Sequence, residues 1–353
     1  MEIITTLNYR RIEEIGSAGQ NSKVFRVFDE HLHAELAVKE IQKSRLGDPS
    51  RYFSEARAVH ASAHARVVPI RWAGKNDEII SLAMPIMPGG SLSDRIREKP
   101  LRASEVIKIG QDLCEGVAQV HIAGFVHLDI KPTNVLFDVD GRASVSDFGL
   151  ALKLDDMATA DARDQALYPS FFPPEMMNAK GVVSPASDVY QVGLTLFRAL
   201  MGDAAFKSQW ARIREPYPAG RDAIRAGTFP ERVFLPGVPL ALRKAILSAL
   251  HVDPALRQVG ARKLAEELAA VEVKHDWEVE GYAPSEITWR LRSPDRADVV
   301  VLQRGELPAS SVEIWTESAA GRRKKTPDAW SSKIRTMKQL RAALSRAFRS
   351  AES

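Results

Sequence analysis

Four polar residues have the types and spacing that phosphoryl transfer requires. Asp129, Lys131 and Asn134 lie within one short segment, and Asp147 begins an Asp-Phe-Gly sequence soon after it. The transfer needs a carboxylate to orient and deprotonate an acceptor hydroxyl, oxygen ligands for Mg²⁺, and positive charge near the phosphates. Asp129 suits the first task, Asn134 and Asp147 the second, and Lys131 the third. One aspartate alone would predict nothing, because most aspartates cap helices or occupy solvated turns.

A lysine and a glutamate upstream extend this charged set. Lys39 lies in the apolar-rich run 34–41, which predicts a buried strand. Because burying an unpaired ammonium group is costly, Lys39 needs anionic partners. We expect these to be nucleotide phosphates and the carboxylate of Glu55, on a helix predicted over residues 49–63. Glu55 alone would be interpreted as part of a solvated helix face.

The order of these segments resembles the eukaryotic-type (Hanks-type) serine/threonine protein kinase family. Residues 127–134 (HLDIKPTN) resemble its catalytic loop, residues 147–149 (DFG) its metal-binding motif and residues 37–39 (AVK) its strand lysine. Residues 173–175 (PPE) resemble the end of its activation segment, and residues 187–193 (SDVYQVG) the start of its central helix. The resemblance covers roughly three quarters of the chain, and the abundance of Ala and Arg suggests a bacterial member.

The resemblance implies an ATP- and Mg²⁺-dependent enzyme that phosphorylates serine or threonine in protein substrates. Asp129 and Lys131 would be catalytic, and Asn134 and Asp147 would bind the metal. The nucleotide would meet a glycine-rich loop, the strand lysine with its glutamate, and a hinge. These expected ATP-binding residues are Gly16, Ser17, Ala18, Gly19, Ser22, Val24, Ala37, Lys39, Glu55, Met84, Ile86 and Met87.

The implied fold is α+β and bilobal, with a kinase domain over residues 1–273. A β-rich N-lobe would cover about residues 1–87 and an α-helical C-lobe about residues 88–273. Two structural contacts are also implied. Asp188 would hydrogen-bond the backbone of the catalytic loop, and Arg257 would pair with Glu175 at the end of the activation segment.

Some residues depart from the family pattern. Ser22 replaces the third glycine of the nucleotide-covering loop, and Pro85 removes a backbone donor at the start of the hinge. Leu128 replaces an arginine that, in many regulated kinases, binds a phosphorylated activation segment. We therefore expect activity that does not depend on phosphorylation of this segment. Its only hydroxyl residues between Leu150 and Pro173 are Thr159, Tyr168 and Ser170.

Two other functions remain open. In a pseudokinase scaffold, the fold would bind nucleotide or a partner without catalysis. The altered glycine loop supports this alternative, as does Tyr168, which replaces a threonine typical of serine/threonine kinases. A small-molecule kinase of related fold is the second alternative. The Lys131-Pro132 pair, the sequence at residues 173–175 and Arg257 argue against it, because all three resemble protein kinases.

Composition is that of an ordinary globular protein. The chain has 353 residues, of which 45% are hydrophobic and 27% charged. Its single cysteine, Cys114, excludes an intramolecular disulfide and favours a buried thiol in a reducing compartment. No apolar run reaches the length of a membrane span, and the N-terminus lacks a basic-then-apolar signal. We therefore expect a cytoplasmic protein without a membrane span.

Residues 274–353 lie beyond the resemblance and predict a small accessory module of strands and a helix. Its first part, 274–320, is net acidic and holds several strand candidates, including the alternating Ile287, Trp289 and Leu291. The other predicted strands cover residues 275–282, 298–303 and 311–316. Because disordered tails are poor in aromatic residues, four tryptophans in this region indicate that it folds. They are Trp277, Trp289, Trp315 and Trp330.

The second part of the module, 321–353, is predicted to be a basic helical tail. Residues 321–349 hold ten Lys or Arg against one Asp, and residues 332–349 predict an amphipathic helix. Packing of its apolar stripe on the protein is one interpretation. Contact with an acidic protein or with nucleic acid is another, and membrane-surface binding lacks a Trp-rich insertion face. The stripe comprises Ile334, Met337, Leu340, Leu344 and Phe348.

Overall fold

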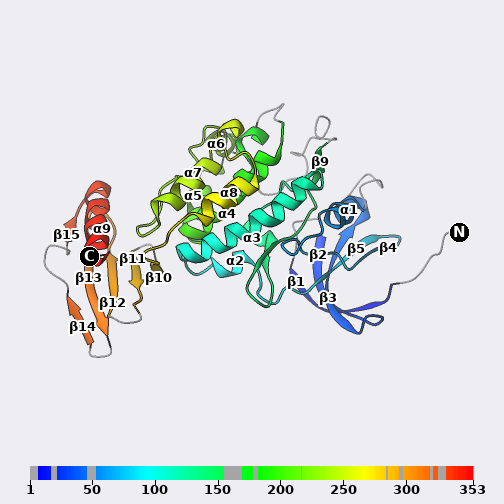
Figure 1. Cartoon of the computed structure of the whole chain (residues 1–353), viewed down its shortest axis with the longest axis horizontal. Helices are drawn as coiled ribbons and strands as arrows, with labels where there is room; N and C mark the ends of the chain where they lie inside the picture. The colour runs from blue at the N-terminus through cyan, green and yellow to red at the C-terminus, as the bar shows by residue number, and fades with distance from the viewer. Residues whose placement is uncertain are drawn as a thin grey trace.

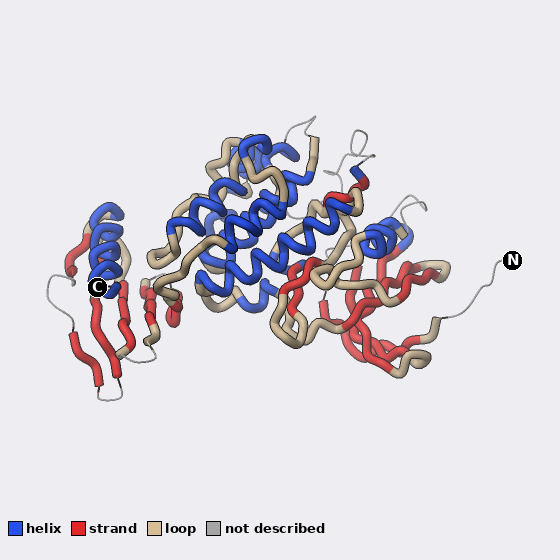
Figure 2. Tube along the Cα trace, in the orientation of Figure 1, coloured by secondary structure: helices blue, strands red, loops and turns tan. Residues whose placement is uncertain are grey.

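The computed structural model shows three units in a row (Figures 1 and 2). A β-rich lobe carries the N-terminus at one end, a helical lobe forms the middle, and a sheet with one helix lies at the C-terminal end. The described residues are 7–16, 22–45, 53–154, 169–177, 182–215, 217–283, 285–293, 297–318, 321–324 and 331–352.

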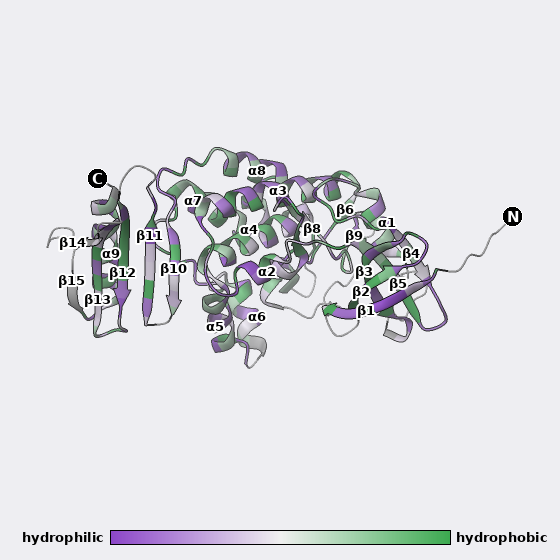
Figure 3. Ribbon diagram, turned by 90° about the horizontal axis from the view of Figure 1, so that it is seen from below, coloured by the Kyte–Doolittle hydropathy of each residue, from purple (hydrophilic) through white to green (hydrophobic). Residues whose placement is uncertain are grey.

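The N-lobe is a five-stranded antiparallel sheet in the order β1-β2-β3-β5-β4. β3 lies in the middle, and its buried central residues include Lys39. β1 is an edge strand that is almost entirely exposed and largely hydrophilic (Figure 3). The strands are β1 (Tyr9–Gly16), β2 (Ser22–Asp29), β3 (Ala34–Gln42), β4 (Trp72–Lys75) and β5 (Ile79–Pro85), and the 3₁₀ turn η1 (Lys43–Arg45) follows β3.

One helix, α1 (Ser54–Ala61), accompanies this sheet. It begins later and ends earlier than the helix predicted over residues 49–63, whose first part lies outside the described residues. The helix buries Glu55, Ala58 and Val59. Glu55 is therefore turned inward rather than part of a solvated helix face, as its predicted pairing with Lys39 requires.

The C-lobe is built around α4, which begins at a Ser184 cap followed by proline and is buried over most of its length. A side chain at Gly193 would place its Cβ 2.7 Å from the Cβ of Ala249, so glycine permits the close approach of α4 and α7. The helices are α2 (Leu92–Arg95), α3 (Ala103–Ile122), α4 (Pro185–Met201), α5 (Asp203–Ile213), α6 (Tyr217–Arg225), α7 (Leu240–Ala249) and α8 (Ala261–Ala269).

Short strands and turns next to these helices carry the polar motifs. Two small antiparallel pairs, β6–β9 and β7–β8, frame the segment from residue 125 to residue 153. The strands are β6 (Phe125–Val126), β7 (Val135–Phe137), β8 (Ala143–Val145) and β9 (Leu152–Lys153); the 3₁₀ turns are η3 (Pro132–Asn134), η6 (Pro169–Phe171), η7 (Pro174–Met177) and η8 (Pro254–Leu256). The predicted bilobal kinase fold is thus confirmed, together with the additional strands and helix at the C-terminus.

The C-terminal module is a six-stranded antiparallel sheet with one helix. The order is β10-β11-β12-β13-β14, and β15 also pairs with β13. Trp277, Trp289 and Phe348 meet in the core between the sheet and α9. The Phe348 ring centroid lies 4.5 Å from that of Trp277 and 5.7 Å from that of Trp289. The elements are β10 (Glu278–Ala283), β11 (Glu286–Leu291), β12 (Asp298–Arg304), β13 (Ser310–Ser318), β14 (Gly321–Lys324), β15 (Ser331–Ile334) and α9 (Met337–Glu352).

The helix prediction over residues 332–349 is wrong at its start, and so is the division of the module into a β-rich part and a helical tail. β14 and β15 lie within the predicted tail, and Ile334 is buried as part of a strand. A capping box fixes the start of α9: Thr336 Oγ1 accepts from Gln339 N–H at 3.2 Å, and Gln339 Oε1 accepts from Thr336 N–H at 3.2 Å. Met337 in the first turn is 51% exposed and does not belong to the buried stripe.

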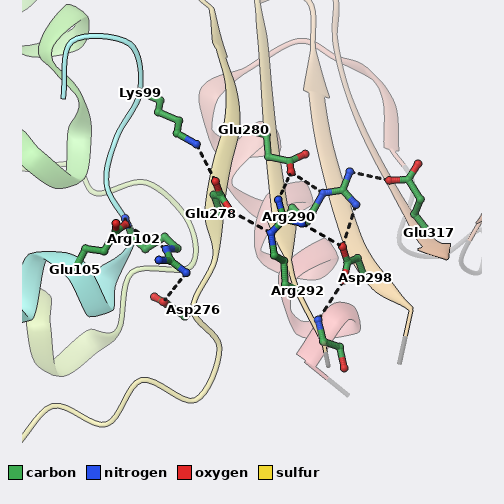
Figure 4. A network of polar contacts seen from close by, with 11 residues as sticks. Lys99, Arg102, Glu105, Asp276, Glu278, Glu280, Arg290, Arg292, Asp298 and Glu317 are labelled. Atoms are coloured by element: carbon green, nitrogen blue, oxygen red, sulfur yellow. Dashed lines mark hydrogen bonds and ion pairs between the residues drawn. The ribbon is translucent and has the colours of Figure 1, made fainter. Parts of the chain in front are cut away.

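Polar contacts join this module to the C-lobe (Figure 4). Lys99 Nζ, just before α3, lies 2.8 Å from Glu278 Oε1 on β10. Tyr282 Oη donates to the carbonyl oxygen of Met201 at the end of α4, at 2.8 Å. On the sheet itself, Arg290 of β11 forms ion pairs with carboxylates from three other strands, β10, β12 and β13. Within the described ranges, none of the helices combines the length and hydrophobicity needed to cross a lipid bilayer.

Candidate active site

Lys39 lies at the centre of a buried charged cluster between the lobes. Its Nζ is 2.9 and 2.8 Å from the two carboxylate oxygens of Glu55 and 2.6 Å from Asp147 Oδ1. Burial disfavours the ammonium form, but the Asp147 and Glu55 carboxylates raise the pKa of Lys39 above its ordinary value. Burial raises the pKa of Glu55 despite the lysine charge. Three groups from β3, α1 and the loop after β8 are thereby held together.

The catalytic-loop residues form a second polar cluster. Lys131 Nζ lies 2.7 Å from both carboxylate oxygens of Asp129, and Asn134 Nδ2 donates to Asp129 Oδ2 at 2.9 Å. Burial raises the pKa of the Asp129 carboxyl to about 6, although the nearby Lys131 charge opposes the shift. Such a carboxylate is ionised at neutral pH and has a pKa close enough to neutrality to accept a proton in a reaction.

The backbone around these side chains is fixed by Asp188 on α4. Its carboxylate accepts the N–H groups of His127 and Leu128, both at 2.8 Å, and is completely buried. Leu128 has a φ of 63°, a conformation that a non-glycine residue adopts only when its surroundings hold it there. The predicted contact between Asp188 and the catalytic loop is confirmed.

The expected nucleotide-binding residues that can be described flank the charged clusters. Ala37 on β3 pairs with Met84 on β5, and Val24 on β2 pairs with Lys39, so these positions share neighbouring strands. Ile86 and Met87 are half-buried in the connection between the lobes, Gly16 is exposed at the end of β1, and Ser22 is buried at the start of β2. Ser17, Ala18 and Gly19 lie outside the described residues.

The oxygen donors in this region suit a hydrated divalent cation. Within the described residues, no hydrogen bond reaches Asp147 Oδ2, and Asn134 Oδ1 accepts only the hydroxyl of Thr133, at 3.2 Å. The same parts of the chain hold no group of three or more His, Cys, Asp or Glu that would enclose a metal. Mg²⁺ usually takes one or two protein oxygens and completes its shell with water and phosphate. The residues therefore fit Mg²⁺ bound with a nucleotide.

A family model for the protein kinase domain matches residues 9–259. This chain belongs to the protein kinase domain family. It is 28% identical over 259 residues to "Serine/threonine-protein kinase PknL" of Mycobacterium tuberculosis (72% of this chain, 63% of that protein). It is also 28% identical over 250 residues to "Serine/threonine-protein kinase PrkC" of Bacillus subtilis (70% and 38%). The chain thus spans less than two thirds of the length of these curated relatives, and the sequence resemblance to a bacterial-like kinase is confirmed.

Glu175, at the end of the activation segment, forms a buried ion pair with Arg257. Arg257 Nη1 and Nη2 donate to the two carboxylate oxygens of Glu175 at 2.9 and 2.7 Å, and Ser187 Oγ donates to Glu175 Oε1 at 2.6 Å. The predicted pairing of Arg257 with Glu175 is confirmed. Tyr168 and Thr159 lie outside the described residues.

Sequence reasoning missed one side chain in this site, Gln191. It is completely buried on α4, where it hydrogen-bonds the catalytic loop and the end of the activation segment. The only signal in the sequence was an amide residue within a helix that is otherwise mostly apolar. Such a residue requires buried partners, but the sequence does not identify them.

Proposed function

We propose that the chain is a serine/threonine protein kinase that transfers the γ-phosphoryl group of ATP to protein hydroxyls. The observation that carries this proposal is the simultaneous presence of both charged clusters. Lys39 contacts Glu55, and Asp129 lies within hydrogen-bonding reach of Lys131 and Asn134. A kinase needs both sets in place before it can align ATP with an acceptor.

Each side chain has a task in this proposal. Asp129 orients the acceptor hydroxyl and accepts its proton, and Lys131 balances the negative charge that collects beside it. Lys39, held by Glu55, would bind the α- and β-phosphates, and Asn134 and Asp147 would hold Mg²⁺ through their side-chain oxygens. When bound, Mg²⁺ would supply positive charge beside the phosphates.

In the same proposal, apolar residues of the N-lobe sheet and the hinge would bind the adenine ring of ATP. Val24, Ala37 and Met84 would line the ring, and the backbone at Ile86 and Met87 would meet its edge. Gly16, Ser17, Ala18, Gly19 and Ser22 would cover the phosphates.

Activity is proposed to be independent of phosphorylation in the activation segment. Leu128 is 1% exposed, packs in the apolar core and offers no charge to a phosphate. Replacing Thr159, Tyr168 and Ser170 together with Val, Phe and Ala should therefore leave turnover within about twofold of the wild type. Loss of activity in this variant would refute phosphorylation independence while leaving the kinase proposal intact.

An acceptor panel separates this function from the alternatives. The purified chain would be incubated with radiolabelled MgATP and either a basic protein or small alcohols, followed by phosphoamino-acid analysis. The proposal predicts label on serine or threonine of the protein. Label on a small alcohol alone would support a small-molecule kinase, and nucleotide binding without any transfer would support a pseudokinase scaffold.

We also propose that residues 1–273 form the catalytic unit and residues 274–353 an accessory module fixed to it. The contacts of Glu278 with Lys99 and of Tyr282 with Met201 support fixed attachment. A cytoplasmic location belongs to the same proposal, because the single Cys114 is buried as a free thiol and suits a reducing compartment.

The exposed face of α9 is proposed to bind an acidic segment of a protein substrate. Lys338, Arg341 and Arg349 are exposed on this helix, and no carboxylate in the described parts of the chain forms an ion pair with them. The apolar face of α9, with Leu340 and Leu344, is buried against the sheet and is not available to a membrane. A substrate bound to a fixed module would have a raised local concentration at the catalytic unit.

Charge reversal tests this surface. Replacing Lys338, Arg341 and Arg349 with Glu should raise KM for an acidic-tailed substrate and leave KM for a short peptide unchanged. The matched control reverses three exposed cations of the C-lobe, outside the C-terminal module, and should have no such effect. Salt-sensitive binding to duplex nucleic acid, with no effect on the acidic substrate, would assign the face to nucleic acid instead. The control residues are Lys108, Arg221 and Lys244.

A further inference from the structure

Gln191 makes three buried hydrogen bonds to two separate parts of the chain. Its Oε1 accepts from the backbone N–H of Ile130 at 3.0 Å, and its Nε2 donates to the carbonyl oxygens of Leu128 at 2.8 Å and Phe171 at 3.2 Å. The side chain is completely buried on α4. Leu128 and Ile130 flank the catalytic aspartate, whereas Phe171 belongs to the end of the activation segment.

This bonding pattern fixes the orientation of the amide. The two Nε2 hydrogens each have one carbonyl acceptor, and Oε1 faces an N–H donor. A flipped amide would set its oxygen against two carbonyl oxygens and its NH₂ group against an N–H. Gln191 is thus satisfied in one arrangement only, and that arrangement requires the segment end to stay beside the catalytic loop.

Leu128 and Gln191 together suggest what this amide does. An arginine in place of Leu128 would have joined the catalytic loop to a phosphorylated segment, but leucine has no charge to do so. We infer that Gln191 is a positioning residue that ties the end of the activation segment, where an acceptor peptide would lie in the proposed kinase, to the catalytic loop without phosphorylation. The inference rests on the proposed kinase function. It adds that the Gln191 amide takes the place of a phosphate in holding the activation segment.

Independent contacts anchor the Phe171 side chain. Its ring centroid lies 5.5 Å from that of Phe206 on α5, and the Arg198 guanidinium carbon lies 5.3 Å from the Phe171 ring. Glu175, further along the segment, is held by Arg257. Loss of the Gln191 bond would therefore loosen the Phe171 backbone locally rather than unfold the segment.

The test replaces Gln191 with Met, which has similar length but no amide. The matched control is Thr195→Val, one turn further along α4 and equally buried. Thr195 Oγ1 donates to the carbonyl oxygen of Ile130 at 3.3 Å, and none of its described hydrogen bonds reaches the activation segment. Both variants thus remove contact with the catalytic loop, but only Gln191→Met removes contact with Phe171.

We expect Gln191→Met to raise KM for a protein substrate about tenfold, as loss of a buried hydrogen bond would, with KM for ATP within about twofold. Thr195→Val should leave KM for the protein substrate within about twofold of the wild type. Hydrogen exchange of a peptide covering residues 171–177, measured without substrate, should become faster in Gln191→Met only.

A second variant adds a pH-dependent readout that misfolding alone would not produce. In Gln191→Glu the ionised carboxylate accepts from Ile130 but cannot donate to Phe171, whereas the protonated acid regains one donor. Its protein-substrate KM, relative to the wild type at each pH, should therefore fall as the pH is lowered from 8 to 6, because burial raises the pKa of a carboxyl group.

Clear results would overturn the inference. An unchanged protein-substrate KM and unchanged exchange in Gln191→Met would do so, and so would equal effects in Gln191→Met and Thr195→Val. If the wild type transfers phosphate to no protein, the proposed function fails. The exchange measurement still decides in that case whether Gln191 holds the segment.

Discussion

Removing Arg257 should destabilise the C-lobe by an amount that its contacts allow us to estimate. All five guanidinium N–H groups have acceptors: two carboxylate oxygens of Glu175 and one backbone carbonyl each from Ala186, His251 and Val252. Arg257→Met leaves the buried Glu175 carboxylate with the Ser187 hydroxyl as its one remaining partner among the described residues, and leaves three carbonyls without this donor. Breaking a buried pair in this way costs about 4 kcal/mol.

Glu175→Gln supplies the comparison. Arg257 keeps its three carbonyl acceptors and a neutral amide oxygen, so the remaining charge is better solvated than the stranded carboxylate of Arg257→Met. We expect a loss of about 2 kcal/mol. Equilibrium unfolding in urea, followed by circular dichroism, measures both variants. Equal losses, a reversed order, or losses below about 1 kcal/mol would refute this account of the pair.

Three further predictions concern other contacts. Burial opposes ionisation of Asp188, but its bonds to His121 and the His127 amide lower its pKa. The ionised carboxylate therefore stabilises the folded protein above about pH 4, and this contribution is lost as the pH falls through the folded-state pKa. The difference in melting temperature between the wild type and Asp188→Asn should therefore decrease as the pH is lowered below about 4. Gly237→Leu should detach the C-terminal module, because a Cβ there would lie 2.8 Å from Trp277; proteolysis should then cut near residue 274. Trp289→Phe should cost below about 2 kcal/mol in thermal unfolding, because its buried indole N–H has no partner among the described residues.

The charged pairs of the site were predictable from the sequence because family motifs encode them. Lys39 needed an anion in a buried strand, and Glu55 lay on the next helix. Asp188 and Arg257 likewise belonged to motifs with implied partners. In each case a charged side chain in an apolar setting could have only a few partners, and the structure contains the predicted one.

Other features required the three-dimensional structure. The alternation of Ile287, Trp289 and Leu291 predicted a strand correctly, but the helical pattern over residues 332–349 hid β15. The periodicity of apolar residues does not show where a helix begins, whereas the capping box at Thr336 sets the start of α9. Gln191 was missed for a different reason: its partners are backbone groups, which leave no trace in side-chain types.

The central claim is that Asp129 acts in phosphoryl transfer to protein hydroxyls. The direct measurement is transfer of radiolabelled phosphate from MgATP to a generic basic protein by the wild type and by Asp129→Asn, with nucleotide affinity measured in parallel. The account predicts label on serine or threonine with the wild type, loss of at least about a hundredfold in rate with Asp129→Asn, and nearly unchanged MgATP binding. Equal transfer by the two proteins, or MgATP binding without transfer by the wild type, would contradict it.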